Sequence, residues 1–211
     1  MKKNIIKDFP HFLHGGDYNP DQWLHLPEVI NEDFRLMKLA GLNTFSLGIF
    51  CWSQLEPEEG VFTFDWLDEI MDRMAAEKFN VILSTPTGAK PLWMSEKYED
   101  VRMVLADGTR ERSGERHNFC WSSPTYHLKT QIIVEKLAER YAKHPALKMW
   151  HISNELGAHH KGSNCYCDYC MEGFYRFLRK KYGDLDTLNR VYWSAFWSHR
   201  YDKWEQVDPR D

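Results

Sequence analysis

The sequence predicts an α/β fold, specifically the first half of a (β/α)8 TIM barrel with about four strand–helix units. Apolar strand-like segments alternate with amphipathic helix-like segments, which is typical of parallel strands joined by helical crossovers. No glycine-rich turn follows the first strand, as a dinucleotide-binding sheet would require. Polar and aromatic residues gather where strands end, as on the catalytic face of a barrel. The 211 residues are fewer than the roughly 250 of a whole barrel, so residues 1–211 are expected to form one incomplete domain.

The first two units are expected before residue 80. Residues 12–18 form the first predicted strand, and Pro27 opens a helix that Gly41 stops. Residues 42–50 form the second strand, and Asp65 is the expected N-cap of the second helix. The apolar face of this second helix consists of Leu67, Ile70, Met71, Met74 and Ala75.

The third strand is predicted at residues 80–86, followed by a long irregular stretch over 87–122. Ser123 and Pro124 then start a longer helix. Its expected apolar positions are Leu128, Ile132, Ile133, Leu137 and Tyr141.

The fourth strand is predicted at residues 147–153 and the fourth helix at about 169–182. Residues 184–211 are rich in Trp and Tyr and contain only short helical or irregular segments. Because no fifth strand is evident, the sequence indicates a barrel that is cut off after its fourth unit.

Composition excludes several classes of function. The formal charge is −4, from 27 basic and 31 acidic side chains, with no basic block, which argues against a nucleic-acid partner. No apolar run reaches the roughly 18 residues of a membrane span, and the start of the chain lacks the apolar region of a secretory signal. Three of the five cysteines lie within six residues. In a chain without a secretory signal, this clustering indicates a cytoplasmic protein with a metal site.

The end of the fourth strand carries the most informative pair, Asn154 and Glu155. A strand end can hold a glutamate beside a glycosidic oxygen as the general acid/base of a glycosidase. The preceding asparagine can then bind the sugar 2-OH. The alternative is that Glu155 only caps the next turn. In the barrel context, the pair is interpreted as catalytic.

Cys165, Cys167 and Cys170 are spaced closely enough to bind one soft ion, and thiolates suit zinc. Cys120 is the best candidate for a fourth ligand, with His159 and His160 as alternatives. A closed set of four ligands would be structural and would tie the loop after the third strand to the loop after the fourth. Free thiols or a disulfide remain the alternatives. Cys51 ends an apolar strand and is expected to be a buried small side chain.

Other polar and aromatic residues give weaker signals. Arg116 can bind sugar hydroxyls or orient a carboxylate, although its spacing alone fits an ordinary surface arginine. Glu56, Glu58 and Glu59 follow the second strand and are expected to cap or solvate their loop. About half of four tryptophans in loops after strands are expected to line a pocket, and the others to pack; these are Trp23, Trp52, Trp93 and Trp121.

Taken together, the motifs resemble the N-terminal part of the β-galactosidases of glycoside hydrolase family 42. The resemblance covers essentially the whole chain. It is carried by residues 14–23 (HGGDYNPDQW), 49–60 (IFCWSQLEPEEG), 84–93 (STPTGAKPLW), 150–157 (WHISNELG), the Cys-x-Cys-x-x-Cys run and residues 196–204 (FWSHRYDKW).

The resemblance implies a retaining enzyme that removes terminal β-D-galactose, with a structural zinc and often a homotrimeric assembly. By position, Glu155 would be the acid/base, and Arg116 and Asn154 would hold the galactose. The implied zinc ligands are Cys120, Cys165, Cys167 and Cys170. The family's nucleophile is a glutamate late in the barrel, which this chain does not contain, so the chain is expected to be inactive by itself.

Two alternatives remain open on the sequence. The chain can be a non-catalytic, zinc-stabilised fragment that binds sugars. It can also belong to a glycosidase that acts on another β-linked sugar, such as an arabinoside or a fucoside.

Overall fold

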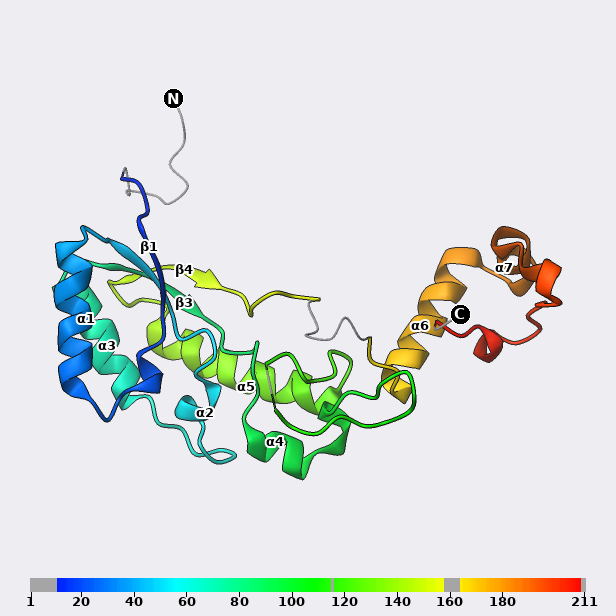
Figure 1. Cartoon of the computed structure of the whole chain (residues 1–211), viewed down its shortest axis with the longest axis horizontal. Coiled ribbons are helices and arrows are strands. Elements are labelled where there is room, and N and C mark those ends of the chain that lie inside the picture. The colour runs from blue at the N-terminus through cyan, green and yellow to red at the C-terminus, as the bar shows by residue number, and fades with distance from the viewer. Residues whose placement is uncertain (1–10, 115, 158–163, 210–211) are drawn as a thin grey trace.

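The computed structural model describes residues 11–114, 116–157 and 164–209. Four parallel strands form one sheet in the order β1–β2–β3–β4, with helices beside it (Figure 1). The predicted α/β architecture is therefore confirmed. The strands are β1 (Gly15–Tyr18), β2 (Thr44–Leu47), β3 (Asn80–Ser84) and β4 (Leu147–His151).

The long crossover helices between consecutive strands are α1 (Pro27–Leu39), α3 (Asp65–Ala76) and α5 (Pro124–Tyr141). Pro27 and Pro124 occupy the first helical position, where the missing N–H costs nothing. Asp65 is not the N-cap that the sequence predicted, because Phe64 is the cap and Asp65 is the first helical residue. An acidic residue there still favours the helix through the dipole.

Eight further helical elements complete the part of the chain that the structure describes. The predicted irregular stretch over residues 87–122 contains two of them, α4 (Leu92–Lys97) and η2 (Glu99–Val101). The others are η1 (Pro20–Gln22), α2 (Trp52–Leu55), α6 (Asp168–Tyr182), α7 (Leu185–Tyr192), η3 (Ser194–Trp197) and η4 (Trp204–Gln206). The first strand starts at Gly15, three residues later than predicted, and Phe12 is 84% exposed.

The main core lies between the sheet and the crossover helices. Along α3 the residues at helical spacing are buried, as predicted, and Ala75 is partly buried against them. The expectation for α5 was wrong at Leu128, which is 55% exposed, whereas Ile133, Leu137 and Tyr141 are buried. Each fully buried large apolar side chain stabilises the fold by roughly 1.5–3 kcal/mol, so this core fixes the strand ends that carry the polar residues.

The segment over residues 164–209 has a small core of its own. Its buried residues are Leu178, Leu188 and Val207. Partly buried aromatic side chains surround them, namely Phe174, Tyr175, Tyr182, Tyr201 and Trp204. In Figure 1 this segment, with α6 and α7, lies to one side of the sheet.

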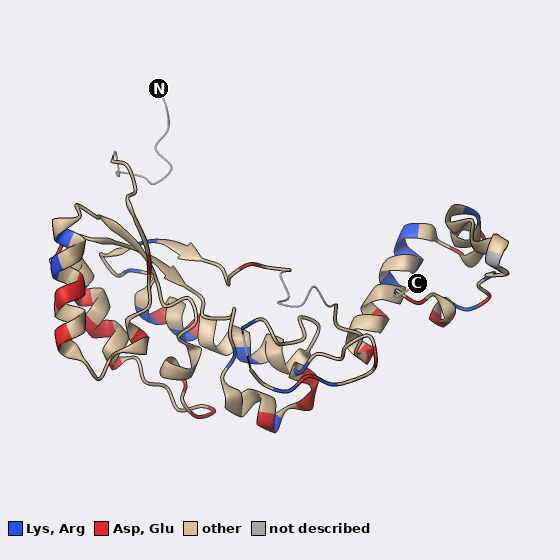
Figure 2. Cartoon of the chain, in the orientation of Figure 1, with Lys and Arg blue, Asp and Glu red and all other residues tan. Residues whose placement is uncertain are grey.

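Charge is mixed over the molecule. Figure 2 shows both signs on the helices and loops, without a continuous basic face in the part of the chain that is drawn in colour. Among the described helices, none is both long enough and apolar enough to cross a membrane.

Candidate active site

The turn after β4 holds an unusual backbone conformation. Ser153 and Glu155 have φ angles of 55° and 46°, in the left-handed region that non-glycine residues rarely adopt. The Ser153 N–H donates to Thr85 Oγ1 at 2.7 Å, which fastens this turn to the loop after β3. Strained backbone of this kind costs of order 1–3 kcal/mol and tends to occur at functional sites.

The Glu155 carboxylate forms an ion pair with Arg116 at this turn. Arg116 Nη2 lies 3.1 Å from Glu155 Oε2, and the two side chains are 37% and 50% exposed. The fully buried His117 ring places Nδ1 4.0 Å from the same oxygen. Arg116 also stands over the Phe50 ring, 5.5 Å from its centroid. A half-exposed carboxylate beside donor groups can exchange a proton with a ligand that arrives from solvent.

Close packing at Gly88 brings the three loops together. A Cβ at this position would lie 3.1 Å from Asn154 Cβ, 3.2 Å from Phe50 Cε1 and 3.4 Å from His117 Nε2. The Gly88 carbonyl also accepts a hydrogen bond from the His117 N–H at 3.0 Å. The loops after β2, β3 and β4 therefore meet at one edge of the sheet, where a side chain at residue 88 would separate them.

The structure brings the three predicted residues Glu155, Arg116 and Asn154 to one place. Sequence reasoning missed the supporting residues Gly88 and His117. His117 does lie in the same short motif as Arg116, but motif spacing alone gives no sign that its ring is buried beside a glutamate. The signal for Gly88 was a glycine in the loop that follows a strand, since glycine allows the backbone to be approached closely.

The acidic residues after β2 are engaged in structural contacts. Glu56 is buried and accepts hydrogen bonds from Trp52 Nε1 and the Gly60 N–H, both at 2.9 Å. Glu59 accepts from Lys97 and Tyr98 and pairs with Lys129. These contacts agree with the predicted capping role for the loop.

The loop tryptophans mostly pack. Trp52 is fully buried, and the Trp93 indole donates to the Glu56 carbonyl at 2.9 Å. The Trp23 indole donates to Asp33 at 3.2 Å. Trp23, Trp93 and Trp121 are partly buried against the main core, so these rings support the strand-end loops.

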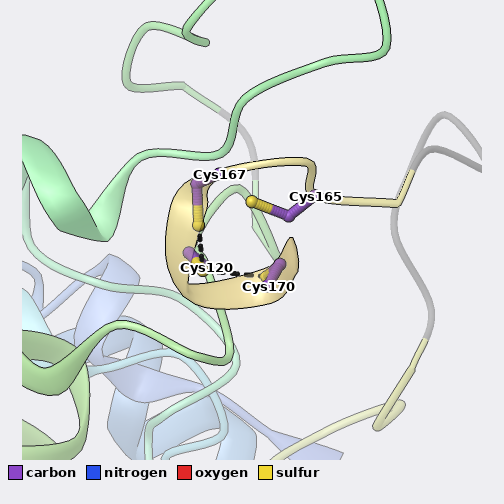
Figure 3. A group of neighbouring side chains, drawn as sticks. All are labelled: Cys120, Cys165, Cys167 and Cys170. Carbon is purple, nitrogen blue, oxygen red and sulfur yellow. Dashed lines mark hydrogen bonds between the residues drawn. The ribbon is translucent and has the colours of Figure 1, made fainter. Parts of the chain in front are cut away.

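All four predicted cysteine ligands converge (Figure 3). The sulfurs of Cys120, Cys165, Cys167 and Cys170 all lie within 4.8 Å of one another. Cys120 Sγ is 3.4 Å from Cys167 Sγ and 3.5 Å from Cys170 Sγ. All five cysteines of the chain are free thiols. The alternative ligands His159 and His160 lie outside the described residues.

The surroundings of this cysteine cluster favour the anionic form at Cys165, whereas the pKa values of Cys120 and Cys170 are raised. Hydrogen bonds from Cys120 and Cys170 lower the pKa of Cys165, and the bond to Cys165 raises the pKa of Cys120. Backbone N–H groups point at two of the sulfurs, from Val104 to Cys165 at 3.5 Å and from Ser122 to Cys120 at 3.3 Å. Amide donors of this kind support thiolates that bind a cation.

The dimensions of the cysteine cluster also fit a metal. Four sulfurs at about 2.3 Å from a tetrahedral ion stand roughly 3.8 Å apart, close to the separations seen here. Cys51 is not part of this cluster: it is buried, and its thiol donates to the Gly48 carbonyl at 3.1 Å. Burial raises the pKa of Cys51, so it remains a small packing side chain, as predicted.

The cysteine cluster joins two parts of the chain. Cys120 belongs to the loop after β3, whereas the other three lie just before α6 or in its first turn. Two hydrogen bonds also connect these parts of the chain. The Tyr166 N–H donates to the Val104 carbonyl at 2.8 Å, and the Cys170 thiol donates to Ser122 Oγ at 3.3 Å. The segment 164–209 is thus fastened beside the loop that carries Arg116.

Comparison with known proteins assigns the family. The sequence profile of glycoside hydrolase family 42, described as β-galactosidase, matches residues 17–210. The chain belongs to this family. The β-galactosidase BglY of Alicyclobacillus acidocaldarius is 52% identical over 204 residues, which are 97% of this chain and 29% of that protein. GanA, a β-galactosidase of Bacillus subtilis, is 51% identical and covers 93% of this chain and 29% of its own length.

Solved structures of family 42 enzymes share the fold. The β-galactosidase from Rahnella sp. R3 superposes with a TM-score of 0.91 at 47% identity, over 97% of this chain and 30% of that structure. The four-stranded sheet therefore corresponds to part of a family 42 barrel. The chain spans about 29% of the length of the curated relatives that it matches.

Proposed function

We propose that the chain supplies the acid/base side of the active site of a retaining β-galactosidase. The observation that carries the proposal is the Arg116–Glu155 pair at 3.1 Å, at the end of β4, in a chain of family 42. Glu155 protonates the glycosidic oxygen of the leaving group. It then acts as a carboxylate base that activates water against the galactosyl-enzyme. The attacking carboxylate comes from the part of the relatives' length beyond these residues.

Asn154 and Arg116 orient the galactose in this proposal. Asn154 lies three residues after the end of β4 and packs against Gly88, so its amide is held near the acid/base. Hydrogen bonds to the sugar 2-OH strengthen in the transition state and supply several kcal/mol in glycosidases of this type. Arg116 offers a planar fork of donors to sugar hydroxyls once a ligand competes for its place beside Glu155.

The cysteine cluster binds a structural zinc in this proposal. Cys120, Cys165, Cys167 and Cys170 are four soft ligands in a closed set, which leaves no position for substrate. Zinc there would hold the loop after β3 against the start of α6. Four reduced thiolates persist in a reducing compartment, which is the ground for a cytoplasmic location. A homotrimeric assembly is proposed from the family alone.

The test uses a chimera in which residues 1–211 replace the matching segment of the Bacillus subtilis enzyme GanA. The chimera should hydrolyse nitrophenyl β-galactoside. Glu155→Gln should abolish most turnover of galactosides with poor leaving groups but retain more with activated aryl galactosides. Added azide should rescue the hydrolysis of the galactosyl-enzyme, because azide is a nucleophile that needs no general base.

The matched control is Glu58→Gln, which removes an exposed glutamate from the loop after β2 and should leave turnover unchanged. Equal loss on both leaving groups without azide rescue would assign the acid to another residue. A panel of nitrophenyl glycosides would decide between galactoside, arabinoside and fucoside. The 211-residue chain by itself should show no turnover, and activity there that Glu58→Gln abolished would reveal a second catalytic carboxylate.

A further inference from the structure

A lysine in the loop after β3 contacts the segment that carries Arg116. Lys90 lies two residues after Gly88 and directly before Pro91, the N-cap of α4. Its side chain turns inward and is only partly accessible to solvent. Lys90 Nζ donates to Asn118 Oδ1 at 2.8 Å. The proposed chemistry of Glu155 does not use this lysine.

The 116–118 segment requires support from its neighbours. His117 has a φ of 56°, a conformation that is unfavourable for a residue with a side chain and persists only where surrounding contacts hold it. Two contacts come from the loop after β3: the Gly88 carbonyl accepts from the His117 N–H, and Lys90 binds Asn118. These two hydrogen bonds hold His117 and Asn118, the two residues that follow Arg116 in the chain.

The surroundings of Lys90 make its charge sensitive to pH. Burial and then the nearby Arg102 cation lower the pKa of Lys90 to about 8, and the Glu111 carboxylate opposes this shift. Asn118 is neutral. The ammonium form is therefore dominant below about pH 8 and the neutral amine above it, while an ordinary lysine keeps its charge to about pH 10.4.

We infer that Lys90 is a positioning residue for Arg116, whose ammonium holds the 116–118 segment so that the guanidinium reaches both Glu155 and the sugar. The inference rests on the proposed function and adds a residue that no sugar needs to touch. A charge-assisted hydrogen bond is stronger than one from a neutral amine, so sugar affinity falls when Lys90 loses its proton.

The sign of the pH effect follows from the direction of the shift. The charged bond to Asn118 is present below about pH 8 and weakens as the pH rises through that value. Folding responds in the opposite sense, because a lowered lysine pKa stabilises the fold at high pH and this contribution is lost as the pH falls. Weaker sugar binding at pH 9.5 is therefore not explained by general unfolding through Lys90.

The experiment measures galactose binding by calorimetry to the GanA chimera carrying Glu155→Gln, so that the acid/base does not titrate. The dissociation constant should rise about tenfold between pH 7 and 9.5, with a midpoint near pH 8. Lys90→Met should bind weakly at both values with a flat profile. Asn118→Asp adds a carboxylate beside the ammonium, so the midpoint should move upward.

The control is Lys180→Met on the exposed side of α6, which should reproduce the parent profile. Metal content is measured for Asn118→Asp because residue 118 lies near Cys120. A pH-independent dissociation constant, or a midpoint that Lys90→Met leaves in place, overturns the inference. Hydrolysis by the chimera without Glu155→Gln is measured in parallel. An active chimera with a flat profile refutes only the role of Lys90, whereas a chimera that neither hydrolyses nor binds galactose refutes the proposed function as well.

Discussion

The sheet with its crossover helices and the segment over residues 164–209 are stabilised in different ways. The first has a large aromatic and aliphatic core, in which the Phe79 ring packs edge to face with Phe45 and at a tilt against Phe34. The second has a hydrophobic cluster of only three buried residues, with the two helices α6 and α7. Small cores rarely stabilise a fold without a disulfide or a metal. We therefore expect the stability of the segment to depend on the cysteine cluster more than the stability of the sheet does.

The exposed aromatic side chains of the segment 164–209 also indicate that its core is small. Trp193 and Phe196 are 85% and 84% exposed, so two of its large aromatic side chains contribute little burial among the described residues. In the sheet region, by contrast, Trp52, Tyr126 and Tyr141 are almost completely buried. The comparison indicates which of the two regions would gain more stability from the proposed zinc, and four changes test it.

The largest effect is expected from removing the metal. Zinc binding in small metal-dependent domains contributes about 10–16 kcal/mol to folding. Cys167→Ser, or chelation of the wild type, should abolish hydrogen-exchange protection in α6 and α7 while β2 and β3 remain protected. Cys51→Ala is the control and should retain zinc. Uniform loss of protection over the whole chain would contradict the proposed difference between the sheet and the segment 164–209. Unchanged protection of α6 would contradict it as well.

Two buried leucines offer a matched comparison of the cores. Leu67 and Leu188 are both completely buried, and leucine-to-alanine changes cost about 2–5 kcal/mol. Leu67→Ala should lower the free energy of unfolding of the sheet region in urea. Leu188→Ala should leave that transition in place and expose only the segment to proteolysis. If Leu188→Ala moved the main transition as far as Leu67→Ala, the two regions would be one cooperative unit.

A helix cap gives a smaller change within the sheet region. Ser123 is the N-cap of α5, and its side chain accepts from the Tyr126 N–H at 3.0 Å. Ser123→Ala should destabilise the protein by about 1 kcal/mol, measured by urea denaturation. Ser123→Thr keeps the acceptor and also the hydroxyl that donates to the Asp100 carboxylate, so it serves as the rescue. Equal destabilisation by both substitutions would mean that packing, not the cap, is responsible.

Acid should weaken the sheet region slightly. Hydrogen bonds from Lys129, Tyr98 and Lys97 lower the pKa of Glu59 to about 2. Because the shift is downward, the stabilisation is fully present above about pH 4.5, the ordinary range of glutamate, and is lost as the pH falls through about 2. Glu59→Gln should reduce the melting temperature at pH 7 and diminish its fall in acid. Glu58→Gln is the exposed control, and an identical acid response in both variants would exclude Glu59.

Local signals in the sequence predicted much of the fold. Pro27, Gly41 and Ser123 have the backbone roles expected of them, at a first helical position, past a helix end and at an N-cap. Leu128 was wrong because periodicity identifies an apolar stripe but not how far the sheet extends beneath it. The short helix α4 was missed because six residues give too little periodicity to identify a helix.

The candidate site was predicted in its residues but not in its geometry. The strand-end position of Glu155 and the clustering of three cysteines are visible along the chain. The Arg116–Glu155 contact and the bond from Ser153 in the left-handed turn to Thr85 join the loops after β3 and β4. The bond from Lys90 to Asn118 joins positions that are 28 residues apart within the loop after β3. Such contacts depend on how the strands align, which no single segment specifies.

The order of the strands also bears on how the protein is made. Strand order in the sheet equals strand order along the chain. As the polypeptide leaves the ribosome from its N-terminus, β2 meets an edge that β1 already offers, and β3 and β4 follow in turn. Cys120 is synthesised well before Cys170, so the four-sulfur cluster can close only after β4 has emerged. In the proposed function, zinc would therefore be captured late, after the sheet has grown.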